Sequence, residues 1–140
     1  MEKKTVLISG GTSGIGLASA RLCARAGMNV VINGRNEERG LQALHEVEPF
    51  GNVVYVKGDV TEEADCQRMV EAAVSTFGNL TGVVTSAGYY RQELLENENS
   101  EEIRRIFEVN VFGTVLLCQA AYGALKKQGG PIVIISSDAG

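Results

Sequence analysis

Cysteine is scarce in this 140-residue sequence, and its three occurrences lie far apart. Cys23, Cys66 and Cys118 each fall within a helical pattern, as small core residues do. Their spacing fits neither a disulfide framework nor a metal site, so we expect no bound metal. Reduced thiols of this kind are typical of an intracellular compartment, and we therefore expect a cytoplasmic protein.

Clustered positive charge and long apolar runs are also lacking. The formal net charge is −4 and the basic residues are dispersed, which argues against nucleic acid or an anionic membrane as a partner. No apolar run approaches a membrane-spanning length. The chain passes from its first residues into an apolar strand, so we expect no signal peptide. We find no tandem repeat and no low-complexity segment.

What the sequence does contain is enough apolar residues, 44% of the total, for the core of a single domain over residues 1–140. These residues gather in short β-branched runs at 5–9, 29–33, 52–57, 82–86 and 131–136. The runs are almost continuously apolar and do not alternate with polar residues. Such runs are typical of strands buried on both faces of a parallel sheet.

Helical patterns fill the segments between the strands. One apolar stripe consists of Ile15, Ala18, Leu22, Cys23 and Ala26. A cleaner stripe consists of Cys66, Met69, Val70, Ala73, Val74 and Phe77. A weaker helix at 36–48 places Leu41 and Leu44 inward. Asn36 and Ser100 are candidate N-caps, each followed by two glutamates. The alternation predicts an α/β fold with a doubly wound parallel sheet.

A glycine-rich turn, SGGTSGIG, joins the first strand to the first helix at residues 9–16. Glycines allow the backbone of such a turn to approach a pyrophosphate, and the helix N-terminus offers N–H groups and a partial positive charge to it. The alternative is a tight turn that binds nothing, but the strand–turn–helix context favours a dinucleotide site. We expect cofactor contacts from Gly10, Thr12, Ser13, Gly14, Ile15 and Gly16.

The spacing Gly10-x-x-x-Gly14-x-Gly16 resembles the TGxxxGxG pattern of the short-chain dehydrogenase/reductase family, with Ser9 in place of the threonine. Four more of that family's motifs follow in the right order, at Asp59-Val60, Ser86-Ala87-Gly88, Asn110 and Ser137. The resemblance covers all 140 residues and implies a Rossmann-type sheet with strand order 3-2-1-4-5.

The resemblance also implies a role for each of these motifs. Asp59 and Val60 would contact the adenine of the cofactor. The turn Ser86-Ala87-Gly88 stands where the family has Asn-Ala-Gly, so its hydrogen bonds differ from the family's. Asn110 and Ser137 correspond to the catalytic asparagine and the catalytic serine.

The end of the second strand indicates which nicotinamide cofactor binds. An acidic residue there would hold the ribose 2′-hydroxyl of NAD, whereas an arginine accommodates the 2′-phosphate of NADP. Here Gly34 takes the strand end and Arg35 follows it. We therefore expect NADP(H) to be favoured over NAD(H), through a charge-assisted contact between guanidinium and phosphate. The alternatives are that Arg35 is a solvated surface charge or that Glu37 and Glu38 point inward.

Asn110 is predicted to lie in an apolar helical stripe with Ile103, Ile106, Phe107, Thr114 and Leu117. Burying an unpartnered amide costs about 1–3 kcal/mol, so Asn110 should have hydrogen-bond partners. It is either a structural tie to a neighbouring strand or, by resemblance, the holder of a water in a proton relay, and the two roles are compatible. Tyr89 and Tyr90 in the preceding loop either stack on a ligand or cover the sheet.

The family's reaction also requires a Tyr-x-x-x-Lys segment after the serine strand. The match Tyr122-Gly-Ala-Leu-Lys126 precedes that strand, at the C-terminal end of the Asn110 helix. Ligands bind at the carboxyl ends of parallel strands, so we interpret Tyr122 as a packing residue and Lys126 as a charge that favours a helix C-terminus. The family's later strands and helices are absent from these 140 residues as well.

By resemblance, the expected function is NADP(H)-dependent reduction of a ketone or oxidation of a secondary alcohol, a small-molecule substrate. The alternative is a non-catalytic dinucleotide-binding module, because the Tyr-x-x-x-Lys segment is missing and the 140-residue chain is expected to be inactive alone. A nucleotide-independent interaction domain is disfavoured by the glycine turn and Asp59. A bare strand edge and an uncovered apolar helix stripe predict self-association or poor solubility of these 140 residues. By resemblance, we also expect a homo-oligomer.

Overall fold

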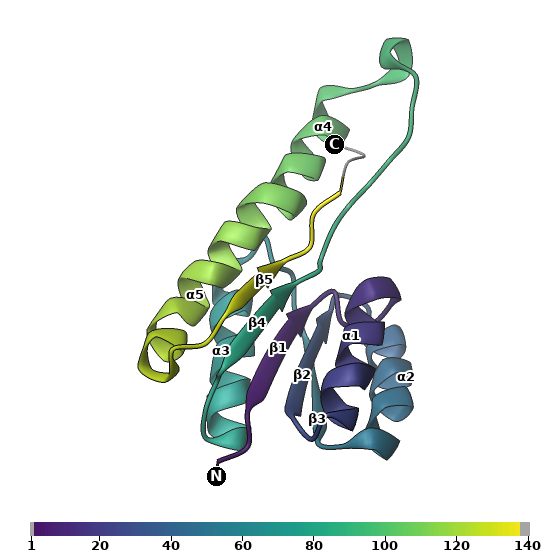
Figure 1. Ribbon diagram of the computed structural model, residues 1–140. Helices are drawn as coiled ribbons and strands as arrows, with labels where there is room; N and C mark the ends of the chain where they lie inside the picture. The colour runs from purple at the N-terminus through teal and green to yellow at the C-terminus, as the bar shows by residue number, and fades with distance from the viewer. Residues whose placement is uncertain (1, 138–140) are drawn as a thin grey trace.

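A computed structural model describes residues 2–137 and contains one parallel sheet of five strands with helices on both faces (Figure 1). The strand order is β3-β2-β1-β4-β5, which confirms the predicted order. Asp138, Ala139 and Gly140, which follow the candidate serine, lie outside the described residues. The strands are β1 (Thr5–Ser9), β2 (Asn29–Gly34), β3 (Val53–Lys57), β4 (Gly82–Thr85) and β5 (Ile132–Ile134).

The helices form two layers. One layer consists of α1 (Gly14–Arg25) and α2 (Glu37–Val47), whose buried side chains pack on Ile8 and Ile32 of the sheet. The opposite layer consists of α3 (Glu63–Phe77) and α5 (Gly113–Gln128), which pack on Leu7 and Val31. Short 3₁₀ turns occupy Glu48–Phe50 and Leu95–Asn97. Neighbouring strand residues therefore face different helix layers, which explains why each strand is apolar throughout.

Two helices present a different face to the sheet from the one predicted. In α1 the buried residues are Gly16, Leu17, Ala20 and Ala24, whereas Ile15 is 61% and Leu22 is 65% exposed. In α2 the buried residues are Gly40, Ala43 and Val47, and Leu41 is exposed. Apart from Leu17 and Val47, the structure turns small residues inward, so that each helix lies close to the sheet.

Gly40 shows why small residues are required in α2. A Cβ atom built on Gly40 would lie 2.1 Å from Cζ of Tyr55, whose ring covers this point of β3. In α3, by contrast, the predicted face is correct for Cys66, Met69, Val70 and Ala73, all of which are buried. Val74, which was expected on the same face, is exposed.

The helix that carries Asn110 has nearly the predicted extent but is less regular than predicted. It begins as α4 (Ser100–Phe107), passes through a π-helical turn at Glu108–Phe112 and continues as α5. The N-cap of α4 is Asn99 and not Ser100, because the Asn99 side chain accepts a hydrogen bond from the Glu102 N–H at 2.9 Å. The predicted cap Asn36 is confirmed for α2, where its side chain accepts from the Arg39 N–H.

The stretch Ser100–Gln128 is, within residues 2–137, the one helical segment long and apolar enough to cross a membrane by length and composition alone. This corrects the expectation that no segment approaches such a length. The core helix of a soluble protein passes the same test. The inner side of Ser100–Gln128 belongs to the core, because Leu117, Ala121 and Leu125 are buried against α3 and the sheet.

The outer side of this stretch and the free edge of the sheet are apolar and exposed. Self-association through these surfaces stays a prediction. The exposed apolar residues are Ile103, Phe107, Val111, Phe112, Val115, Ile132, Val133, Ile134 and Ile135.

The observed buried face of α1 predicts a large loss of stability for substitution of one leucine and a small loss for substitution of another, five residues away. Leu17 is only 9% exposed and packs in the core, so Leu17→Ala should lower the free energy of unfolding by about 2–4 kcal/mol. Leu22→Ala should change it by less than about 0.5 kcal/mol, because the side chain lies on the surface. Urea denaturation measures both. A larger loss of unfolding free energy for Leu22→Ala than for Leu17→Ala would support the buried face predicted from the sequence.

Candidate functional site

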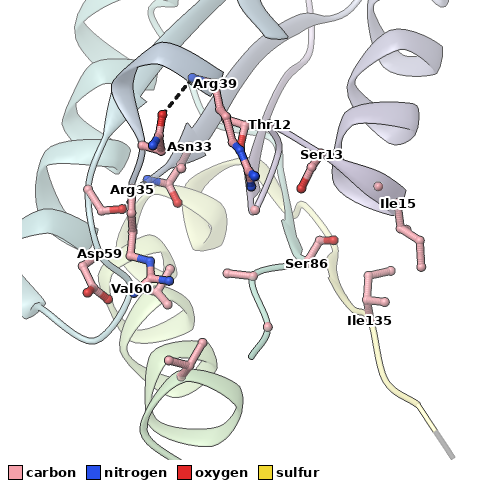
Figure 2. Close-up of a pocket in the computed structure, with 18 residues that line it drawn as sticks. Thr12, Ser13, Ile15, Asn33, Arg35, Arg39, Asp59, Val60, Ser86 and Ile135 are labelled. Atoms are coloured by element: carbon pink, nitrogen blue, oxygen red, sulfur yellow. Dashed lines mark hydrogen bonds between the residues drawn. The ribbon is translucent and has the colours of Figure 1, made fainter. Parts of the chain in front are cut away.

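A cavity of about 420 Å³ opens at the carboxyl ends of β1, β2 and β4 (Figure 2). The strand order reverses at β1, which has β2 on one side and β4 on the other, and such switch points are where ligands bind in open α/β sheets. The predicted cofactor residues that line it are Gly10, Thr12, Ser13, Gly14, Ile15, Arg35, Asp59, Val60, Ser86, Ala87 and Gly88. Of the predicted cofactor residues, only Gly16 is not part of the wall.

Three of the four glycines in the turn, Gly10, Gly14 and Gly16, are explained by different features of the structure. A Cβ on Gly10 would lie 2.7 Å from the backbone of Ala87, and a Cβ on Gly16 would lie 2.1 Å from the Gly10 carbonyl oxygen. Both therefore permit backbone to pack on backbone. Gly14, with φ of +51°, has no atom within 4 Å of such a Cβ. It borders open space at the first residue of α1, where the helix N–H groups can receive a phosphate.

Ser9 joins the two turns that form the floor of the cavity. Its hydroxyl oxygen accepts hydrogen bonds from the N–H groups of Ser86 at 3.2 Å and Ala87 at 3.3 Å. The Ser86 N–H also contacts the Ser9 carbonyl oxygen at 3.2 Å. A hydroxyl is therefore needed at position 9, and serine supplies it as threonine would.

The loop that carries Asp59 and Val60 is held by its neighbours. Asn33 is buried, and its amide donates to the carbonyl oxygens of Val56 and Gly58, each at 3.0 Å. The Asp59 carboxylate accepts from both the N–H and the hydroxyl of Thr61, at 2.9 and 2.8 Å. Asn33 also lines the cavity. It was missed in the sequence because nothing local distinguishes it from a surface residue at a strand end.

Two residues of α3 complete this support. The Asp59 N–H donates to the Asp65 carboxylate at 2.8 Å, and this bond, with a second from Arg68, holds the pKa of Asp65 below its ordinary value. The Cys66 thiol donates to the Val60 carbonyl oxygen at 3.3 Å. Burial, with help from neighbouring carboxylates, raises the pKa of that thiol to about 11, so Cys66 is a neutral core residue.

Two arginines line the cavity, although the sequence indicated only one. Arg39, in the first turn of α2, joins Arg35 in the wall (Figure 2). Within residues 2–137, neither guanidinium forms an ion pair with a carboxylate. Glu37 and Glu38 do not line the cavity.

Glu37 instead lies near Tyr55 of β3. Burial, and after it the Glu37 carboxylate, raise the pKa of the Tyr55 phenol. The concern that these glutamates point inward is therefore removed. The positive charge of Arg35 and Arg39 faces the cavity without an acidic neighbour from the start of α2.

Asn110 lies beside the cavity, in the π-helical turn, and is exposed and not buried as predicted. Its expected hydrogen-bond partners are confirmed. The Tyr89 N–H donates to Asn110 Oδ1 and Asn110 Nδ2 donates to the Tyr89 carbonyl oxygen, both at 2.8 Å. A Cβ on Gly88 would lie 3.3 Å from Asn110 Oδ1, so the amide abuts the wall at Gly88. Tyr89 therefore contacts α4 and the π-helical turn and does not cover the sheet.

Known proteins share both the sequence and the fold of this chain. The family model described as short chain dehydrogenase matches residues 4–140. The L-fucose dehydrogenase of Mus musculus is 38% identical over 96% of this chain, and the L-rhamnose 1-dehydrogenase (NAD(P)(+)) of a Sphingomonas strain is 36% identical over 98%. A short-chain type dehydrogenase/reductase from Mycobacterium ulcerans superposes with a TM-score of 0.93 at 34% identity, over 99% of this chain and 53% of its own.

The chain belongs to the short-chain dehydrogenase/reductase family. It spans about half the length of the curated relatives it matches, 48% of the mouse protein and 56% of the Sphingomonas protein. Members of this family are oxidoreductases that use NAD(P), and the cavity has the features such a cofactor requires. These are an open Gly14 at a helix N-terminus, a backbone floor and a cationic wall.

Two further residues were considered for short-chain dehydrogenase chemistry, Ser137 and Tyr122. Ile135 lines the cavity, and Ser137, two residues beyond it, is exposed. Tyr122, the tyrosine of the Tyr-x-x-x-Lys match, is 62% exposed and lies in the last turns of α5, far from the carboxyl ends of the strands. It is therefore not a packing residue of the core, and the Lys126 ammonium lies 5.8 Å from the centre of its ring. The catalytic roles of Asn110 and Ser137 stay predictions.

Two glycine variants separate binding from folding. Gly14→Ala places a methyl group in open space where a pyrophosphate would lie, so NADPH affinity should fall about tenfold or more, a loss of roughly 1.4 kcal/mol or more. The positive φ adds a folding cost of about 1–2 kcal/mol. Gly16→Ala should lower the free energy of unfolding by about 1–3 kcal/mol, because its Cβ collides with the Gly10 carbonyl.

Calorimetric titration with NADPH and urea denaturation measure the two effects on the same samples. A folded Gly14→Ala protein that binds NADPH as tightly as the parent would show that the turn is structural only.

Proposed function

We propose that this chain binds NADP(H) in preference to NAD(H) and forms part of an oxidoreductase that reduces a ketone or oxidises a secondary alcohol. The observation that carries the cofactor choice is the pair Arg35 and Arg39, which face the cavity without carboxylate partners among residues 2–137. Both arginines are exposed. A guanidinium in the cavity wall can bind an anion through charge-assisted hydrogen bonds, and the 2′-phosphate is the anion that distinguishes NADP from NAD.

The strand end supports the same choice. In NAD-dependent members of this fold an acidic side chain at the end of the second strand binds the ribose hydroxyls. Here a Cβ on Gly34 would lie 2.7 Å from the Thr12 side chain. Thr12 is β-branched and has little freedom to move away. Position 34 therefore has no room for an acidic side chain, and the arginines supply the polar contacts of that end of the cavity.

The substrate class rests on the residues beside the cavity and on the relatives. The bound cofactor would supply hydride transfer. In this proposal the Ser137 hydroxyl donates a hydrogen bond to the reacting oxygen, and Asn110 organises the proton path beside it. Two relatives are named as dehydrogenases of L-fucose and L-rhamnose, which supports a hydroxyl-bearing small molecule as substrate.

A second candidate is that residues 1–140 by themselves bind dinucleotide without catalysing a reaction. A positioned general acid contributes roughly 10²–10⁴-fold to carbonyl reduction. Tyr122 and Lys126 form the one Tyr-x-x-x-Lys match in the sequence, and they stand at the far end of α5 from the cavity. Turnover would therefore require a proton donor from outside these residues.

Turnover by the 140-residue chain should be negligible and independent of Tyr122. We expect no NADPH oxidation above background with a panel of ketones, for the parent and for Tyr122→Phe alike, because the phenol is remote from the cavity. Absorbance at 340 nm follows the reaction. Turnover in the parent that disappears in Tyr122→Phe would make this tyrosine the acid and overturn the assignment.

Removing either arginine should reduce the preference for NADP(H) selectively. Hydrogen bonds to charged groups contribute about 1.5–3 kcal/mol, so Arg35→Ala should weaken NADPH binding roughly 10- to 100-fold. Arg39→Ala should have a smaller effect of the same kind, and NADH affinity should hardly change in either variant. Titration with 2′,5′-ADP and 5′-AMP isolates the contribution of the 2′-phosphate.

Arg25→Ala is the matched control, because that guanidinium lies over the Phe50 ring at the other end of α1. It should bind both cofactors as the parent does. Equal affinities of the parent for NADPH and NADH, or an equal loss of both in Arg35→Ala, would contradict the proposed specificity.

A further inference from the structure

One loop residue, Tyr89, is bound to the Asn110 helix at three points. Its backbone exchanges two hydrogen bonds with the Asn110 side chain. Its phenol hydroxyl donates to the Glu102 carboxylate at 2.5 Å. The guanidinium carbon of Arg105 lies 4.2 Å from the centre of its ring, within cation–π distance. Tyr89 directly follows Ser86, Ala87 and Gly88, which line the cavity.

The three contacts come from separate turns of one helical stretch. Glu102 lies in the first turn of α4, Arg105 one turn later, and Asn110 in the π-helical turn. An amide side chain on an exposed helix face has rotamer freedom, and the two 2.8 Å bonds to Tyr89 remove it only if Tyr89 is itself fixed. The contacts of Tyr89 with Glu102 and Arg105 supply that fixation from the same helix.

We propose that the Tyr89 side chain, through its contacts with Glu102 and Arg105, keeps the cavity wall at Gly88 and the Asn110 amide in a fixed relative position. We call these contacts the Tyr89 clamp. The residue acts through its neighbours and need not touch substrate or cofactor. We infer that this placement fixes the geometry of the reacting end of the cavity, and that part of the inference rests on the proposed function. The clamp itself does not.

The clamp has a spectroscopic signature. The hydrogen bond to Glu102 raises the pKa of the Tyr89 phenol above its ordinary value, while the charges of Arg105 and Arg91 act in the opposite direction. The bond is therefore present below that raised pKa and is lost when the phenol ionises. In Glu102→Gln the Tyr89 pKa should fall toward the ordinary value, because a neutral acceptor no longer disfavours the phenolate. NMR detection of the tyrosine Cζ resonances resolves this titration.

Amide hydrogen exchange of the Tyr89 N–H, measured by NMR on the protein without cofactor, tests the clamp. Loss of one hydrogen bond to a charged group should accelerate this exchange about tenfold in Tyr89→Phe. The effect should be local, so the Leu7 amide in the core should change by less than about twofold. The matched control is Tyr90→Phe in the next residue, whose side chain is 66% exposed. It should leave both amides unchanged.

A double-mutant cycle completes the test. If the hydroxyl and the carboxylate act only through each other, Tyr89→Phe combined with Glu102→Gln should match Tyr89→Phe alone. The proposal is overturned if the amide of residue 89 exchanges at the parent rate in Tyr89→Phe, or if the Leu7 amide is accelerated equally. Additive effects in the double variant would overturn it as well. NADPH titration of the parent remains separate, because failure to bind would refute the proposed function while leaving the exchange result intact.

Discussion

The contact between the backbone turn after β1 and the backbone turn after β4 is the constraint on which the rest of the site depends. Gly10 adopts φ of +61° and leaves no space for a Cβ against Ala87, while the Ser9 hydroxyl accepts the N–H groups of Ser86 and Ala87. The floor of the cavity is therefore backbone. Gly16 then lets α1 begin directly above this floor, which brings the positive end of the helix to the cavity.

Charge around the cavity is arranged in two regions with different support. At the β2 end, Arg35 and Arg39 face the cavity and the glutamates of α2 do not line it. At the β3 end, the Asp59 carboxylate is held by Thr61, and its N–H is held by Asp65. The hydrogen bonds to Thr61 and Asp65 fix the β3 region. Under the proposed function, the β2 region would receive a phosphate and the β3 region the polar edges of a base.

The strand order and the location of the cavity could be predicted because they follow from local signals. Continuously apolar runs identify buried parallel strands, and the glycine spacing places the first turn at a strand end. The inward faces of α1 and α2 could not, since they depend on close approach to residues such as Tyr55 and not on the size of apolar side chains. Arg39, Asn33 and the partners of Tyr89 were missed for a related reason. Each acquires its role from residues distant in sequence, and only the folded chain brings them together.

A crystal structure of the chain with NADP⁺ tests the central claim most directly. We predict that the pyrophosphate lies at Gly14 over the N-terminus of α1, that the 2′-phosphate accepts hydrogen bonds from Arg35 and Arg39, and that the nicotinamide ribose lies toward Ser86 and Gly88. A 2′-phosphate that points to solvent away from both arginines would contradict the assigned specificity. A dinucleotide bound elsewhere, with Gly14 facing empty space, would contradict the assignment of the site itself.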